Sequence, residues 1–109
     1  MTSDLELNHK LALAIGWRKD QIRIREYAGG SRVECYRVEH GLHIWMPFDF
    51  KEWRIAGSIA ERFDCFPWQD YRRTWTAPIR YKNGVVAGFA EEDTPQLAIA
   101  LAVIQGAGK

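Results

Sequence analysis

The longest apolar stretch of the chain lies near its C-terminus. Eight apolar residues run without interruption from Leu97 to Ile104, and the alanines among them favour a helix over a strand. The hydroxyl of Thr94 can accept a hydrogen bond from a free backbone N–H, and Pro95 suits the first helical position. The pattern therefore predicts a helix from Pro95 to Gln105. Because this helix is apolar nearly all round, other elements must cover it.

The N-terminal half predicts one helix and three strands. Residues 4–15 place apolar side chains at helical spacing, with Ser3 as the N-cap and Gly16 as the stop. Alternating residues and turn residues then predict an antiparallel meander. Its strands are expected at 21–27, 33–38 and 42–46.

The C-terminal half predicts a second helix and further strands. Residues 50–63 form an amphipathic pattern that Asp49 can cap, and we expect its Trp53 to lie in the core with Leu101. Residues 64–70 are expected to form a loop. Asn83 followed by Gly84 is the strongest hairpin signal of the chain. The strands are expected at 71–76, 79–82 and 85–90, and the first two can also be one strand bent at Pro78.

These elements predict an α+β fold in a single domain that spans residues 1–109. The order is αβββαββ(β)α, with three helices and one antiparallel sheet of about five or six strands. Short connections favour antiparallel pairing. The helices are expected to cover one or both faces of the sheet in a layered α/β or α/β/α sandwich.

Composition narrows the classes of function. The net charge is +1, so no global field attracts the protein to DNA or to an anionic membrane. No apolar run is long enough to span a membrane, and the first ten residues do not resemble a signal peptide. We therefore expect a cytoplasmic protein in which Cys35 and Cys65 are reduced thiols.

Catalytic and metal-binding motifs are not found in the sequence. Nucleotide-binding, zinc-protease and hydrolase motifs do not occur. The histidines, at positions 9, 40 and 43, and the acidic residues 91–93 are better explained as exposed or structural than as metal ligands. We expect no catalytic residue, no metal and no cofactor, and the sequence favours a protein that is not an enzyme.

Basic and aromatic residues give the clearest binding signal. Arginine beside an exposed aromatic residue can hold single-stranded nucleic acid by phosphate contact and base stacking. The alternative is that these aromatic residues belong to the core and the arginines to the solvent-exposed face of a half-buried sheet. The candidate contact residues are Arg72, Arg73, Trp75 and Arg80, together with Arg23 and Arg25 if the two hairpins share a face.

Three segments resemble the phage ABA sandwich domain, a family of small phage and prophage proteins. They are the helix end from Leu11 to Trp17, the capped helix with Asp49 and Trp53, and the segment from Thr94 to Ile99 with Ala102 behind it. The resemblance implies a three-layer α/β/α arrangement, no known catalytic residues, and a place in the host cytoplasm.

Two classes of function follow. The first is a phage accessory protein of unknown activity that binds a protein partner or forms a homodimer. The second is a module that binds single-stranded nucleic acid through a basic and aromatic sheet face.

Overall fold

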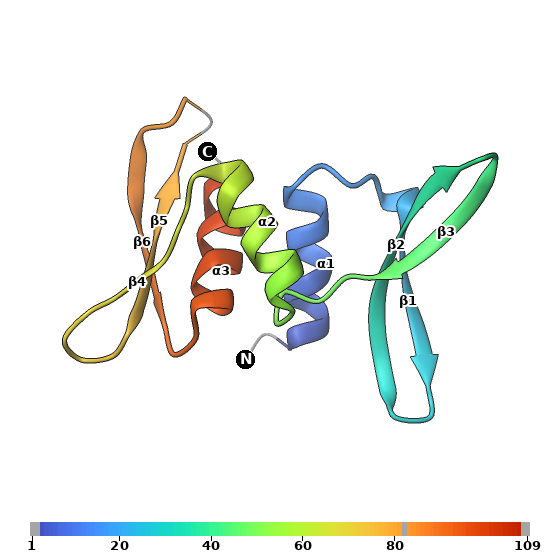
Figure 1. Ribbon diagram of the computed structural model, residues 1–109, viewed down its shortest axis with the longest axis horizontal. Helices are drawn as coiled ribbons and strands as arrows, with labels where there is room; N and C mark the ends of the chain where they lie inside the picture. The colour runs from blue at the N-terminus through green and yellow to red at the C-terminus, as the bar shows by residue number, and fades with distance from the viewer. Residues whose placement is uncertain (1–2, 82, 108–109) are drawn as a thin grey trace. The chain divides into compact units, whose positions relative to one another are not determined.

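The computed structural model describes residues 3–81 and 83–107 (Figure 1). These residues form three α-helices, six strands and one short 3₁₀ helix. The fold is α+β with three helices, as predicted. The prediction of one sheet is wrong, because the six strands form two separate three-stranded sheets. Within each sheet, strands that follow one another in sequence pair antiparallel. The third and fourth strands, which a helical segment separates, belong to different sheets.

The chain divides into two units, which are described separately. Unit 1 ends at Asp49 and unit 2 begins at Phe50. This division does not decide whether residues 1–109 form the expected single domain, which therefore stays a prediction. No helix among the described residues is long and apolar enough to cross a membrane.

Unit 1 begins with α1 (Asp4–Ala14). The hydroxyl of Ser3 accepts a hydrogen bond from the backbone N–H of Glu6 at 3.2 Å, as predicted for an N-cap. Gly16 has a φ of 110°, and the N–H of Trp17 donates to the carbonyl of Ala12 at 3.0 Å. This pattern is a Schellman motif, which satisfies carbonyl groups at the end of the helix.

Sheet A completes unit 1 and has the strand order β1-β2-β3. Its strands are β1 (Ile22–Tyr27), β2 (Gly30–Glu39) and β3 (Leu42–Pro47), and the short helix η1 (Lys19–Gln21) precedes them. α1 contacts β2. Because Val33 and Cys35 are the buried apolar residues of β2, we assign α1 to their face of the sheet.

Unit 2 contains sheet B and two helices. The strands are β4 (Trp68–Gln69), β5 (Trp75–Arg80) and β6 (Val86–Glu92), and the helices are α2 (Trp53–Phe63) and α3 (Pro95–Ala107). α3 contacts β5, β6 and α2. Its small residues lie against small residues of the sheet, which allows close packing. The buried cluster consists of Ala77, Ile79, Ala90, Ala98 and Ala102.

The N-terminus of α2 differs from the prediction. Glu52, and not Asp49, is the N-cap residue, and its side chain makes no capping hydrogen bond. Asp49 instead accepts a hydrogen bond from the side chain of Asn8 at 3.4 Å. Trp53 is 54% exposed, so its predicted burial is wrong. Its ring lies beside Gly57, where a β-carbon would be 4.0 Å from the nearest ring atoms.

The strands of sheet B also differ in part. The predicted strand at 71–76 is wrong over its first residues, which form a turn, and the predicted loop at 64–70 contains β4. β5 runs through Pro78 as one strand, which was the alternative prediction. The backbone N–H of Tyr81 donates a hydrogen bond to the carbonyl of Val85 across the turn. Because the backbone groups of successive residues in a strand point to opposite edges, the nitrogen of Pro78 lies at the edge of β5 that faces away from β6. Since β4 pairs only with Trp75 and Thr76, proline at position 78 disrupts no ladder bond. The predicted end of this segment, Lys82, lies outside the described residues.

Candidate functional site

One face of sheet A is built mainly from arginine and aromatic residues. Arg23 lies opposite Glu34 and Arg25 opposite Arg32, while Tyr36 lies opposite Trp45. Directly opposed residues share a face, and this face is the reverse of the one that carries Val33 and Cys35. We call it the arginine–aromatic face. Its charged and aromatic members are Arg23, Arg25, Tyr27, Arg32, Glu34, Tyr36, His43 and Trp45.

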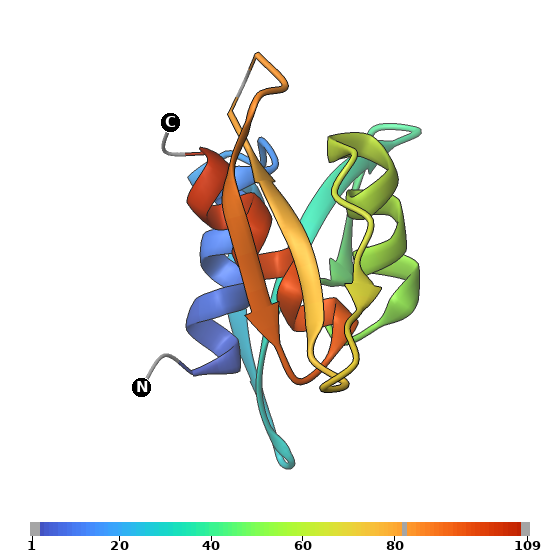
Figure 2. The same cartoon turned by 90° about the vertical axis from the view of Figure 1, so that its left-hand side faces the viewer.

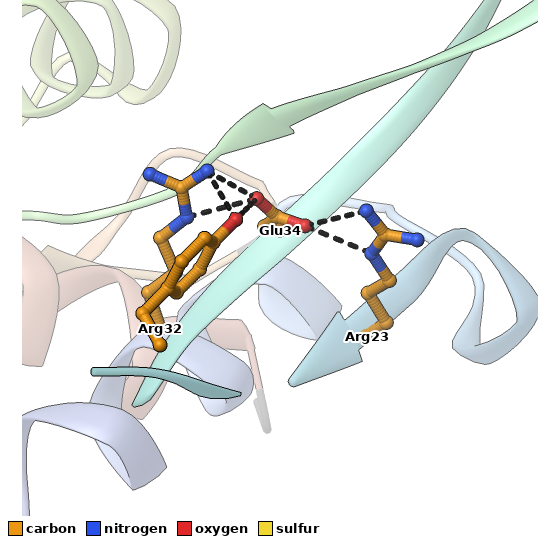
Figure 3. Close-up of polar contacts among 4 residues, drawn as sticks. Arg23, Arg32 and Glu34 are labelled. Carbon is orange, nitrogen blue, oxygen red and sulfur yellow. Dashed lines mark hydrogen bonds and ion pairs between the residues drawn. The ribbon is translucent and has the colours of Figure 1, made fainter. Parts of the chain in front are cut away.

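Glu34 is the centre of this face, and its residue is only 1% exposed. Its Oε1 accepts hydrogen bonds from Arg23 at 2.8 Å, and its Oε2 accepts from Arg32 at 2.8 Å and from the hydroxyl of Tyr27 at 2.9 Å. Figure 3 shows the two guanidinium groups on opposite sides of the carboxylate, each with one nitrogen that does not bond Glu34. A buried carboxylate with these partners is fully compensated.

The hydrogen bonds keep Glu34 ionised. Burial by itself would raise the pKa of Glu34, but the bonds donated by Arg23, Tyr27 and Arg32 outweigh burial and lower its pKa to about 2. The hydrogen bond to Glu34 in turn raises the pKa of Arg32. Glu34 and Arg32 therefore stay charged at neutral pH.

Aromatic rings also contact the guanidinium groups of the arginines on this face. The guanidinium carbon of Arg23 lies 4.1 Å from the ring centroid of Trp45. Those of Arg32 and Arg25 lie 4.3 Å and 5.1 Å from the centroid of Tyr27. These are cation–π contacts, which restrict the orientation of each guanidinium plane.

Two further aromatic contacts extend the face along β2 and β3. Tyr36 stacks on His43 with centroids 4.4 Å apart and an interplanar angle of 17°. It meets Trp45 edge to face at 4.8 Å. The result is a continuous row of rings beside the arginine cluster. Three arginines against one glutamate give the whole face a net charge of +2, with His43 neutral, although the chain as a whole carries +1.

The residues predicted as contacts in unit 2 are not brought into one surface. Trp75 is half-buried and packs against the cluster under α3, whereas Arg80 lies on the opposite face of β5 by strand alternation. Arg80 donates to the carbonyl of Asp64 at 2.7 Å and to that of Gly84 at 3.0 Å. Its role in the structure is to join two loops.

Arg72 and Arg73 lie in the turn before β5. The carboxylate of Asp70 accepts hydrogen bonds from the backbone N–H groups of Arg72 and Thr74, and it also pairs with the Arg72 side chain at 3.3 Å. Arg73 has a φ of 63°, in the left-handed region. The turn therefore presents these arginines to solvent beside Tyr71, which is 93% exposed.

The sequence prediction found two members of the arginine–aromatic face, Arg23 and Arg25, and missed the others. The reason is the hairpin register. β2 begins at Gly30, directly after the two-residue turn, and Tyr27 pairs with Gly30. This register places Arg32 and Glu34 opposite the two predicted arginines. The available signal was the alternation of polar and aromatic residues at 32, 34 and 36.

No group of three or more His, Cys, Asp or Glu side chains in the described part of the chain is arranged to hold a metal ion. Comparison with known proteins found no matching family model, curated protein or solved structure.

Proposed function

We propose that this protein binds single-stranded nucleic acid through the arginine–aromatic face of sheet A. The observation that carries the proposal is the combination of three arginines fixed on aromatic rings with a row of further rings on the same open sheet. Arginine supplies the contact to phosphate, and a ring or a guanidinium plane supplies a surface on which a base can stack.

The network around Glu34 supports this proposal by fixing the arginines before a ligand arrives. Arg23 and Arg32 each use two nitrogens on the carboxylate, which leaves one terminal nitrogen to donate elsewhere. Because the side chains are already ordered, binding costs less side-chain entropy than it would for free arginines. Arg25 makes no bond to Glu34 and is exposed, so it is the freest charge of the face.

A single strand fits this face better than a duplex. Bases of a single strand are free to lie on aromatic side chains, whereas those of a duplex are already stacked on one another. The face is the surface of a three-stranded sheet and presents no helix that could enter the major groove. We expect contacts to phosphate and to base planes, and therefore little dependence on base sequence.

The test is fluorescence anisotropy with labelled oligothymidine and oligouridine, at several salt concentrations. We expect binding that weakens as salt rises. Arg25→Ala should lower the affinity and reduce the slope of log K against log salt by about 0.7, the value for one lost contact on a single strand. Duplex DNA of the same length should bind more weakly.

Arg37→Ala is the matched control. Arg37 also lies in sheet A, and its replacement by alanine removes the same charge. By strand alternation Arg37 is on the other face, where it pairs with Glu39 at 2.8 Å. The Arg37→Ala variant should bind the oligonucleotides with the same affinity as the unmodified protein. If no oligonucleotide binds at low salt, or if the two variants behave alike, the proposal is wrong.

The resemblance to the phage ABA sandwich domain supports a broader proposal. It is that the chain is a phage- or prophage-encoded accessory protein that acts in the host cytoplasm by binding a macromolecule, either a protein partner or nucleic acid. This proposal rests on the three segments that resemble the family, above all the residues from Thr94 to Ile99, and the nucleic-acid proposal does not depend on it. The test is the gene neighbourhood: phage structural or replication genes on both sides would support the proposal, and a neighbourhood of host genes alone would contradict it.

A further inference from the structure

Arg25 and Arg32 form a pair of like charges across the β1–β2 hairpin. The two residues lie directly opposite each other in the register, and their guanidinium carbons lie 5.1 Å and 4.3 Å from the centroid of the Tyr27 ring. Both cations therefore contact the same ring. Like charges in directly opposed positions destabilise an antiparallel pair, so an anion bound between them would relieve this repulsion.

The carboxylate of the arginine–aromatic face does not neutralise this pair. Glu34 binds Arg23 as well as Arg32, so two arginines share one negative charge. Arg25 makes no ion pair within the part of the chain that the structure describes, and its neighbours on the face are Arg23, Tyr27 and Arg32. Counting Arg23 and Glu34 as a neutral pair leaves two positive charges, at Arg25 and Arg32.

The free donors of both guanidinium groups are accessible. β1 is an edge strand of sheet A, Arg25 is exposed, and the side chain of Arg32 is 46% exposed. Arg32 uses two of its nitrogens on Glu34 and Tyr27, which leaves one terminal nitrogen, whereas the whole guanidinium group of Arg25 is available. Together the two side chains can donate to several oxygens of one anion.

The pair lies close to the end of the face. Between the pair and the turn, the face holds only Tyr27 and Gly30, which close the hairpin. In Figure 1 and Figure 2 this turn extends past the other described elements of unit 1. The rings of Tyr36 and Trp45 lie in the other direction, four residues along β2, or about 13 Å away. Because the face ends at the turn, a strand stacked on these rings meets the arginine pair at one of its own ends.

A phosphate monoester suits this pair better than the phosphodiester links within a strand. At neutral pH it carries a charge of about −1.5 to −2 and three oxygens that accept hydrogen bonds, whereas each phosphodiester carries one charge. We propose that Arg25 and Arg32 bind the terminal phosphate of a single-stranded nucleic acid whose bases stack on the neighbouring rings. This inference rests on the proposed function and adds the phosphorylated end to the description of the ligand. The row of rings favours nucleic acid over a phosphorylated peptide, because every base has a plane for stacking.

The test is competition against the labelled oligothymidine by unlabelled oligothymidines of about ten nucleotides that differ only at their ends. One form carries a 5′ phosphate, one carries a 3′ phosphate, and one has hydroxyl groups at both ends. We expect at least one phosphorylated form to compete about tenfold better than the hydroxyl form, and that form identifies the end that is held. A hydroxyl-ended oligothymidine one nucleotide longer adds a charge without the monoester, and it should gain less than about twofold.

Arg25→Lys separates this contact from a general attraction to phosphate. Lysine keeps the positive charge but lacks the planar guanidinium fork, so the variant should still bind the hydroxyl form while its preference for the phosphorylated form falls to about twofold or less. Arg37→Lys is the matched control, because by strand alternation Arg37 lies on the other face of sheet A. It should keep the full preference. Circular dichroism establishes that both variants are folded.

Each way in which the experiment can fail has a distinct meaning. Binding without a preference for either phosphorylated form would overturn this inference and leave the proposed function intact. An unchanged preference in Arg25→Lys would also overturn it, as would a short phosphoserine peptide that competes better than the phosphorylated oligothymidines. If no oligonucleotide binds at low salt, the proposed function is wrong and this inference fails with it.

Discussion

Gly106 of α3 lies directly against the backbone of Arg80 in β5. A β-carbon built on Gly106 would be 2.5 Å from the carbonyl oxygen of Arg80. Arg80 is held in place by its own bonds to the loops at Asp64 and Gly84. The end of α3, the end of α2 and the hairpin turn therefore meet at one residue.

We predict that Gly106→Ala destabilises the protein. Alanine usually favours a helix by about 1 kcal/mol over glycine, but here its methyl group would displace the backbone of Arg80. Overpacking of this kind costs about 1 to 3 kcal/mol. The net free energy of unfolding should fall, and urea denaturation followed by circular dichroism measures it.

Gly57→Ala is the matched control in α2. A β-carbon at this position would be 4.0 Å from the ring of Trp53, which is an ordinary contact. We expect it to raise the free energy of unfolding by about 0.5 to 1 kcal/mol through helix propensity. Equal effects of the two substitutions would show that Arg80 can move away without cost.

The centre of α3 gives a second stability prediction. Ile99 is 0% exposed, whereas Leu101 is half-buried and packs at the edge of the cluster. Ile99→Ala should cost about 2 to 5 kcal/mol through lost burial and the cavity that remains. Leu101→Ala should cost clearly less. Thermal unfolding of the two variants compares them, and a larger loss for Leu101→Ala would contradict this assignment of the core.

Helix ends were the features that the sequence predicted best. Ser3, Gly16 and Thr94 act locally, within one turn of the residues that they cap, so their effect can be inferred without knowledge of the fold. Thr94 accepts from the N–H of Leu97 at 3.2 Å, as expected. Asp49 was wrongly assigned as a cap because its hydrogen bond with Asn8, a residue 41 positions away, is a tertiary contact.

The division into two sheets and the arginine–aromatic face were not predicted, for the same reason. Alternation indicates which residues form a strand, but it does not determine which strands pair. The burial of Glu34 was also not predicted, because a charged residue in a strand is normally assigned to the solvent-exposed face of the sheet. Its burial depends on Arg23, Arg32 and Tyr27 meeting at one carboxylate.

The two cysteines should be chemically inert in the folded protein. Both are buried free thiols. Burial raises the pKa of Cys35 to about 12 and, with the nearby charge of Asp64, that of Cys65 to about 11. Since the thiolate is the reactive form, Ellman's reagent at neutral pH should label neither until guanidinium chloride unfolds the chain. Rapid labelling of the native protein would show that a thiol is accessible.

The last prediction concerns the stability of unit 1 in acid. The pKa of Glu34 is about 2 in the folded protein against an ordinary value of 4.5. Because the folded state favours the ionised form, its contribution is complete above pH 4.5 and is lost as the pH falls toward 2. A shift of this size corresponds to about 3 kcal/mol.

Glu34→Gln should therefore lower the free energy of unfolding near neutral pH by about 1 to 3 kcal/mol, because a neutral amide replaces the charged acceptor of two half-exposed guanidinium groups. The difference from the unmodified protein should shrink as the pH falls below that of an ordinary glutamate. Glu39→Gln, in the same strand, removes an exposed pair with Arg37 and should cost no more than about 1 kcal/mol. Urea denaturation at a series of pH values measures all three proteins. A Glu34→Gln deficit that stayed constant down to about pH 2 would contradict the proposed ionised, buried carboxylate.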